Sequence, residues 1–326
     1  MKTGLKIVKN RVLCTIYARK HGWRPKIGVR AWRFHGIVDS YLDPSVEHYF
    51  NTTKELKDAI EVFKNFDSIS LQEIAQILGE KKHAEATQVL VTFDDGYRNN
   101  IFACEMLTKA GIRTAVFVCP GHEGGETIWT AEVTLLVLHG GRDSIELLGR
   151  LWRLEKAEER AAAAIAIRRE MKRLGSESRW AAMRQLRDQF PKERTKELLQ
   201  YFKSLQLMSW DEIRYLSDMG VEIGSHGCFH EIHNRNQTDV VLEEDVRRSK
   251  AIIEHKLRRS CVAFAYPNGD VNSRSQEIVA KAGYEIAFTT KRGIIDGADC
   301  PLELPRMKGG RMFATVRDAY YEAERV

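Results

Sequence analysis

Short apolar runs and helical apolar spacings alternate along most of this 326-residue chain. The runs Thr87 to Phe93 and Thr114 to Val118 are β-branched and bounded by polar residues, as buried parallel strands are. Between them, Asn100 to Ala110 has the spacing of a helix that ends at Gly111. The pattern predicts further strands and helices at residues 29–38, 52–63, 71–78, 221–224, 240–257, 261–266, 273–282 and 285–289. Repeated units of this kind predict an α/β fold of parallel strands joined by helical crossovers.

The alternation stops between about residues 126 and 206. Neither Gly nor Pro occurs from Arg150 to Leu174, where the sequence is rich in Ala, Glu and Arg. Trp180, Met183 and Leu186 then recur at the spacing of an amphipathic helix. We therefore predict a helical insertion within the α/β domain.

The composition, with 43% hydrophobic and 29% charged residues, is that of a folded globular protein and excludes a disordered or collagen-like chain. The chain has no run of eighteen uncharged apolar residues, so no membrane span is predicted. The predicted organisation is a basic arm at residues 1–29, a barrel-like domain at 30–310 interrupted by the helical insertion at 126–206, and a tail at 311–326.

Basic residues are concentrated at the N-terminus. The net charge is +6, and the first 38 residues contain ten Lys or Arg and no acid. Leu5, Val8, Val12 and Ile16 recur there at helical spacing, which is typical of a basic helix on an anionic membrane surface. A solvated arm is the alternative, and no aromatic-interleaved basic groove or nucleic-acid motif accompanies the charge. We expect peripheral membrane contact through this arm and no nucleic-acid partner.

The N-terminal segment does not resemble a secretory signal. Its apolar run, Val12 to Ala18, is interrupted by Thr15 and followed by Arg19 and Lys20, with no small-residue cleavage site nearby. The six cysteines are scattered without a Cys-x-x-Cys motif, as reduced and buried thiols are. We therefore expect a cytoplasmic protein that contacts the inner face of the membrane.

Side chains that can bind a metal follow two of the predicted strands, where the reactive groups of parallel α/β folds lie. Asp94 and Asp95 come directly after one strand, and Gly96 lets the chain turn beneath them. Two adjacent buried carboxylates are costly unless a cation or hydrogen bonds hold them. His226 and His230 follow a second strand, and on one face of a helical turn they can chelate one metal. Each motif alone has a structural explanation, an Asx turn or a packing pair, but their conjunction favours a metal site.

One aspartate and two histidines make a three-ligand site with open positions, as catalytic metal centres have. Zn²⁺ is the first choice by ligand type, while Co²⁺, Ni²⁺ and Fe²⁺ also fit. Such a metal lowers the pKa of a bound water toward about 7, and the second aspartate can take a proton as that water attacks a carbonyl. After a third strand, Pro267, Asn268 and Gly269 form a turn that either directs a backbone N–H towards an oxyanion or serves only as a turn.

Three strand ends therefore carry motifs: TFDDGY at 92–97, SHGCFH at 225–230 and FAYPNGD at 264–270. The first two resemble the first and second motifs of the polysaccharide deacetylases, and the last resembles a divergent form of their third motif. This family is carbohydrate esterase family 4, also called the NodB-type domain. The resemblance covers roughly residues 30–120 and 207–310.

The resemblance implies a distorted (β/α) barrel of about seven parallel strands. It also implies a hydrolase that removes an N-acetyl or other acyl group from a sugar. By the same resemblance, one divalent metal is held by Asp95, His226 and His230, with Asp94 as the general base.

Three features of the family are missing from this chain. Ala265 stands where the third motif often has an arginine that orients the base, and Asn268 stands where an aromatic residue often follows the proline. No histidine follows His255 to supply the usual general acid. We expect Arg306 to restore the positive charge beside Asp94. The candidates for the general acid are His35, His122 and His233. Residues expected to contact the substrate or its oxyanion are Asn268, Tyr97, His233 and His35.

Two other functions share these residues. Two histidines and one carboxylate also describe the facial triad of non-haem iron oxygenases, although such a site needs no second adjacent carboxylate. A carbohydrate-binding protein that kept the metal and lost turnover is the other alternative, because the arginine and the late histidine are missing. For an enzyme without an export signal, the expected substrate is an acylated amino sugar in a nucleotide-linked or lipid-linked glycan precursor.

Overall fold

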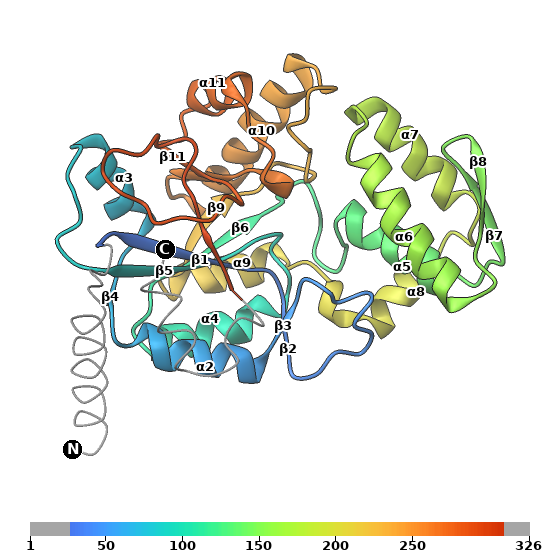
Figure 1. The fold of residues 1–326 in the computed structure, drawn as a ribbon, viewed down its shortest axis with the longest axis horizontal. Helices are drawn as coiled ribbons and strands as arrows, with labels where there is room; N and C mark the ends of the chain where they lie inside the picture. The colour runs from blue at the N-terminus through green and yellow to red at the C-terminus, as the bar shows by residue number, and fades with distance from the viewer. Residues whose placement is uncertain (1–26, 310–326) are drawn as a thin grey trace, which may run out of the picture.

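A sheet of parallel strands lies at the centre of the molecule (Figure 1). The computed structural model describes residues 27–309. The strands of this sheet are β1 (Val29–Phe34), β4 (Asp67–Ser68), β5 (Gln88–Phe93), β6 (Thr114–Val118), β9 (Glu222–Ser225), β10 (Ala263–Ala265), β11 (Ile286–Phe288) and β12 (Met307–Lys308). Their order is β11-β10-β9-β6-β5-β1-β12, and β4 pairs with β5 beside this path.

The two ends of this strand order meet. An isolated parallel bridge joins Phe288, at the end of β11, to Leu304, which lies just before β12. The Thr289 N–H donates to the Leu304 carbonyl at 2.8 Å, and β12 pairs with β1. Residues 304–308 therefore touch both edges of the sheet and close it into a barrel. The expected distorted (β/α) barrel of about seven parallel strands is confirmed.

Helices surround the barrel in chain order, as crossover connections require. They are α2 (Thr53–Phe63), α3 (Leu71–Gly79), α4 (Asn100–Lys109), α9 (Trp210–Asp218), α10 (Asp239–Leu257) and α11 (Ser273–Lys281). Thr52 and Ser209 form the capping boxes of α2 and α9, as the sequence predicts.

Alternate residues of the strands face two different apolar layers. In β5, Val89 and Val91 pack towards the outer helices, whereas Leu90 belongs to the interior cluster. Small residues such as Ala31 and Ala263 also line the interior. A barrel of so few strands is narrow, so small side chains fit its centre.

The segment between β6 and α9 forms a lobe on one side of the barrel (Figure 1). It consists of α5 (Trp129–His139), β7 (Ser144–Leu147), β8 (Arg150–Arg153), α6 (Ala157–Met171), α7 (Ser176–Arg187), α8 (Arg194–Tyr201) and the 3₁₀ turn η1 (Lys203–Leu205). Its buried side chains form a separate apolar cluster. The antiparallel hairpin β7–β8 departs from the wholly helical insertion that the sequence predicts.

The predicted strand at 29–38 is divided. β1 ends at Phe34, and β2 (Ile37–Val38) pairs with β3 (Asn51–Thr52) in a separate small sheet. Gly36, between β1 and β2, leaves room for the Phe50 ring, because a Cβ there would lie 2.6 Å from that ring.

None of the helices in residues 27–309 combines the length and apolar character needed to cross a bilayer. The predicted tail at 311–326, and all but the last residues of the predicted arm at 1–29, lie outside the described residues.

Candidate metal and catalytic site

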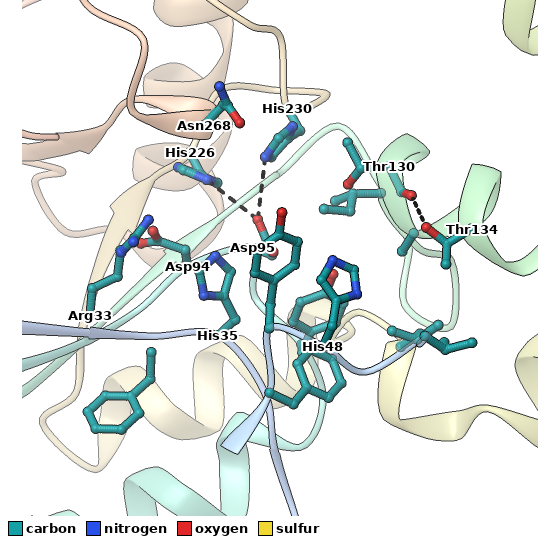
Figure 2. A pocket seen from close by; sticks show the side chains of 18 of the residues that line it. Arg33, His35, His48, Asp94, Asp95, Thr130, Thr134, His226, His230 and Asn268 are labelled. Atoms are coloured by element: carbon teal, nitrogen blue, oxygen red, sulfur yellow. Dashed lines mark hydrogen bonds and ion pairs between the residues drawn. The ribbon is translucent and has the colours of Figure 1, made fainter. Parts of the chain in front are cut away.

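A pocket of about 130 Å³ opens where β1, β5 and β9 end. Asp94 and Asp95 follow β5, and His226 follows β9, so the closed barrel brings together motifs that are far apart in the sequence. Figure 2 shows the imidazoles of His226 and His230 directed at Asp95. The insertion supplies one wall of the pocket through Thr130 on α5 and residues of α6.

The two aspartates point to different partners because the backbone turns sharply between them. Asp95 has a φ of 74° and Gly96 a φ of 82°, both in the left-handed region. A Cβ at Gly96 would also approach the Val118 side chain to 3.1 Å. This turn therefore requires glycine at position 96. The left-handed backbone of Asp95 directs its side chain away from that of Asp94.

Asp95, His226 and His230 form a buried cluster whose ligand atoms all lie within 4.8 Å of one another. The Asp95 Oδ1 atom is 3.4 Å from His226 Nε2 and 3.6 Å from His230 Nε2. This oxygen has no hydrogen-bond partner among the described residues. A buried, unpartnered carboxylate oxygen facing two imidazole nitrogens fits a divalent cation.

The protonation of the two histidines also suits a cation. The His226 Nδ1–H donates to the Ala265 carbonyl at 2.7 Å, which leaves Nε2 as the free lone pair. Burial lowers the pKa of both histidines, so their neutral, ligating forms are favoured. Burial and the charge of Asp94 raise the pKa of Asp95 to about 7, although the Tyr97 hydroxyl donates a hydrogen bond to it.

The histidine pair does not lie on a helical turn, and that prediction is wrong. Residues 226–230 form a loop in which Gly227 has a φ of 73° and His230 a φ of 55°. Asp245 Oδ1, on α10, holds the loop by accepting from the backbone N–H of Cys228 at 3.0 Å and of the next residue at 3.3 Å. The two imidazoles converge because of this clamped loop.

Asp94 is paired with Arg306 rather than with the histidines. Arg306 Nη1 and Nη2 donate to the two Asp94 oxygens at 2.7 and 2.8 Å, and Nε donates to the Thr289 carbonyl at 3.0 Å. Burial alone would raise the pKa of Asp94, but the Arg306 charge and its hydrogen bonds lower that pKa far below its usual range. Arg306 thus lies where the sequence placed the missing positive charge, and its part in catalysis stays a prediction.

The other predicted site residues are distributed unevenly. His35 and Asn268 line the pocket, and burial lowers the pKa of His35 to about 3, which makes it neutral. Tyr97 also lines the pocket, but its hydroxyl is used to hold Asp95. His233 is buried and lines a neighbouring groove, and His122 lines neither cavity.

Four cations that the sequence did not single out also line the pocket. They are Arg33, Arg168, Lys172 and Lys308. Arg168 and Lys172 lie four residues apart in and just after α6, a spacing that was visible in the sequence. That α6 faces the barrel was not visible, because a long insertion can pack in many directions.

Comparisons with known proteins agree with this fold. Residues 190–287 match the family model described as polysaccharide deacetylase. The Streptococcus pyogenes deacetylase PplD in complex with acetate superimposes with a TM-score of 0.60 at 15% identity, covering 93% of this chain and 100% of that one. IcaB from Ammonifex degensii has a TM-score of 0.58 at 17% identity, covering 92% and 98%. No curated protein sequence matches the chain.

A polysaccharide deacetylase from Bacillus cereus has a TM-score of 0.54 at 16% identity, covering 91% of this chain and 69% of its own. At such low identities these structures show a common fold. Together with the family match, they confirm the resemblance that the sequence motifs indicate.

Proposed function

Since the chain is related to the polysaccharide deacetylases, we propose that it is a metal-dependent hydrolase that removes an N-acetyl or other acyl group from a sugar. The observation that carries this proposal is the separation of two neighbouring carboxylates. The Asp95 Oδ1 atom faces two histidines without a hydrogen-bond partner among the described residues, whereas Asp94 is held by Arg306 in the same pocket. A hydrolytic site needs both a cation and a nearby base, and this arrangement offers both.

Each residue then has a stated task. Asp95, His226 and His230 would hold one divalent cation, with Zn²⁺ the first choice and Co²⁺, Ni²⁺ or Fe²⁺ also fitting. When bound, such a cation polarises an acyl carbonyl and makes water more acidic. Asp94 accepts a proton at a carboxylate oxygen, which keeps a lone pair beyond its bond to Arg306.

Arg306, His35 and Asn268 support the reaction in different ways. The pairing with Arg306 weakens Asp94 as a base but fixes its direction and keeps it ionised. His35 is the candidate acid that lines the pocket, but in its neutral form the imidazole can only donate a hydrogen bond from its one N–H to the leaving group and must first gain a proton to act as an acid. We assign Asn268 to substrate contact.

The substrate that we propose is an acylated amino sugar in a nucleotide-linked or lipid-linked glycan precursor. Its processing would take place in the cytoplasm, at the inner face of the membrane. Residues 1–29 would make the peripheral contact, because their basic charge complements anionic lipid.

Metal analysis and acyl release together test this function. We expect His226→Ala and His230→Ala to lose stoichiometric Zn²⁺ at neutral pH and to lose turnover of N-acylated sugars. Asp94→Asn should keep the metal while turnover falls by about 10² to 10⁴, the range for a positioned general base.

The outcomes separate the alternatives. Full metal occupancy in both histidine variants would overturn the ligand assignment. Sugar binding by the loaded protein without acyl release would identify a binding protein, and activity that requires oxygen and a 2-oxo acid would identify an oxygenase.

A further inference from the structure

The catalytic pocket continues into a larger groove of about 860 Å³. The two cavities share four lining residues: Tyr49, Arg168, Lys172 and Asn268. Lys172 lines the same pocket as the metal cluster of Asp95, His226 and His230. A substrate held in the groove can therefore extend directly to the reacting acyl group.

The groove has an excess of positive charge. Its charged lining residues are Arg168, Arg169, Lys172, Arg173, Arg235 and Asp270. Within residues 27–309, neither Arg168 nor Lys172 forms a salt bridge with a carboxylate. The one acidic lining residue, Asp270, accepts a hydrogen bond from Asn268 Nδ2 at 2.9 Å.

The two cations nearest the pocket are oriented by neutral groups. Lys172 Nζ donates to Asn268 Oδ1 at 2.6 Å, and Arg168 Nη1 donates to His48 Nε2 at 3.0 Å. The other ring nitrogen of His48 faces the Ser45 carbonyl at 3.1 Å, as a neutral ring donating from Nδ1 would. These contacts position the two charges without neutralising them.

Arg168 and Lys172 are half-buried, so keeping both side chains charged is unfavourable unless an anion lies near them. Burial lowers the pKa of both Arg168 and Lys172, and for Lys172 the neighbouring Arg168 lowers the pKa further. An anion between them would offset both effects. The groove has five cationic side chains and one carboxylate, so its net positive charge is larger than one sugar carboxylate could balance. A phosphate or diphosphate ester carries more negative charge and matches the groove better.

We infer that Arg168 and Lys172 bind a phosphate or diphosphate ester on the sugar that is deacylated, with the phosphate in the groove and the acyl group in the pocket. This inference rests on the proposed function and names the class of its substrate. The arginine offers paired donors to phosphate oxygens, and the lysine a point charge. Both come from the insertion, which thus selects the substrate for a barrel that carries the chemistry.

Two variants and one control test this site. The variants are Arg168→Met and Lys172→Met, and the control is Arg184→Met, an exposed arginine of α7 that lines neither cavity. Substrates are a neutral N-acetyl sugar, its 1-phosphate, a nucleoside diphosphate sugar and a short-chain prenyl diphosphate sugar. We expect the variants to lower the ratio of kcat/KM for phosphorylated over neutral substrate at least tenfold, mainly through KM. The control should leave the ratio unchanged.

The two diphosphate substrates distinguish a nucleotide from a lipid source of the same group. A second measurement needs no turnover: calorimetric binding of inorganic pyrophosphate to metal-free protein, which should weaken at least tenfold in either variant and at high salt.

Equal pyrophosphate binding by wild type and variants, or no preference for phosphorylated sugars, would overturn the inference while the hydrolase stands. Variant-sensitive pyrophosphate binding without acyl release from any substrate would overturn the proposed function while the phosphate site stands.

Discussion

Asp94 and Asp95 are adjacent in sequence, but their carboxylates lie in opposite electrostatic surroundings. Arg306 neutralises Asp94, whereas Asp95 lies beside the Tyr97 hydroxyl and two neutral imidazoles. The positive φ of Asp95 produces this division, because it sends the second side chain to the other side of the strand end. One residue can thus serve as a base while its neighbour serves as a ligand.

The pairing of Arg306 with Asp94 predicts a large stability effect. Arg306→Met should lower the free energy of unfolding of the metal-free protein by about 3–5 kcal/mol, because Asp94 then remains buried without its partner. Denaturant titration measures this. The double variant Arg306→Met/Asp94→Asn removes both charges and should recover most of the loss. A single variant as stable as wild type would contradict a buried ion pair here.

At the residue scale, the sequence predicts which side chains form the site, but it does not predict the backbone conformation of the loops that carry them. The three candidate ligands could be named because carboxylate and imidazole side chains follow strands. The loop that joins His226 to His230 could not be predicted, since it depends on left-handed backbone and on Asp245, which is distant in sequence. Arg306 was found only because a charge was missing elsewhere.

At the scale of elements, three helices hold the loop that carries His230. Asp245 of α10 accepts hydrogen bonds from two backbone N–H groups of the loop, and buried Glu231 in the loop pairs with Arg179 of α7. Trp129 of α5 also donates to the His230 carbonyl at 3.1 Å. The barrel and the insertion therefore both determine where this ligand lies.

Asp245 should make stability depend on pH. Burial and the charge of Glu231 raise its pKa to about 7, above the unfolded value of about 3.9, so the fold favours the protonated form. Its contribution is complete below about pH 4 and is lost as the pH rises towards 7. Asp245→Asn keeps the Oδ1 acceptor and removes the ionisation. The variant's unfolding free energy, relative to wild type, should therefore increase from pH 5 to pH 8.

Denaturant titrations of both proteins at several pH values measure this difference. Asp245→Ala, which also removes the acceptor for the loop N–H groups, is the control and should be less stable at every pH. A constant difference between Asp245→Asn and wild type would show that Asp245 does not titrate in this range.

Element prediction succeeded where local signals are strong. The capping boxes at Thr52 and Ser209 begin helices as expected. The hairpin β7–β8 was missed because its strands are four residues each, and only Ile145 and Leu147 of β7 are buried. An alternation of apolar and polar residues over only four positions cannot be distinguished from the end of an amphipathic helix.

At the scale of the whole molecule, the site lies at the junction of the barrel and the insertion. The sequence predicts both parts, because each has its own hydrophobic pattern. It does not predict that α6 carries Arg168 to the pocket, since this depends on packing over the apolar cluster of the insertion. Long-range packing, not local pattern, assembles the substrate side of the site.

The basic arm predicts salt-sensitive attachment to membranes. Each basic residue near an anionic leaflet adds about 1 kcal/mol, so several together suffice for reversible binding. We expect the full chain to sediment with anionic vesicles at low salt and the chain without residues 1–28 to stay in solution. The truncated protein should still hydrolyse a small water-soluble acylated sugar. Equal sedimentation of the two proteins would refute the role of the arm.

Closure of the barrel by residues 304–308 has a consequence for the order of folding. Arg306 and Asp94 are 212 residues apart, so the loop that their contact closes is very long. Such contacts form late, because chain entropy opposes them until the intervening structure exists. During refolding, β5 and β9 can pair with their neighbouring strands before the Arg306 guanidinium reaches Asp94. Recovery of activity should therefore lag behind recovery of secondary structure and coincide with docking of the last strand.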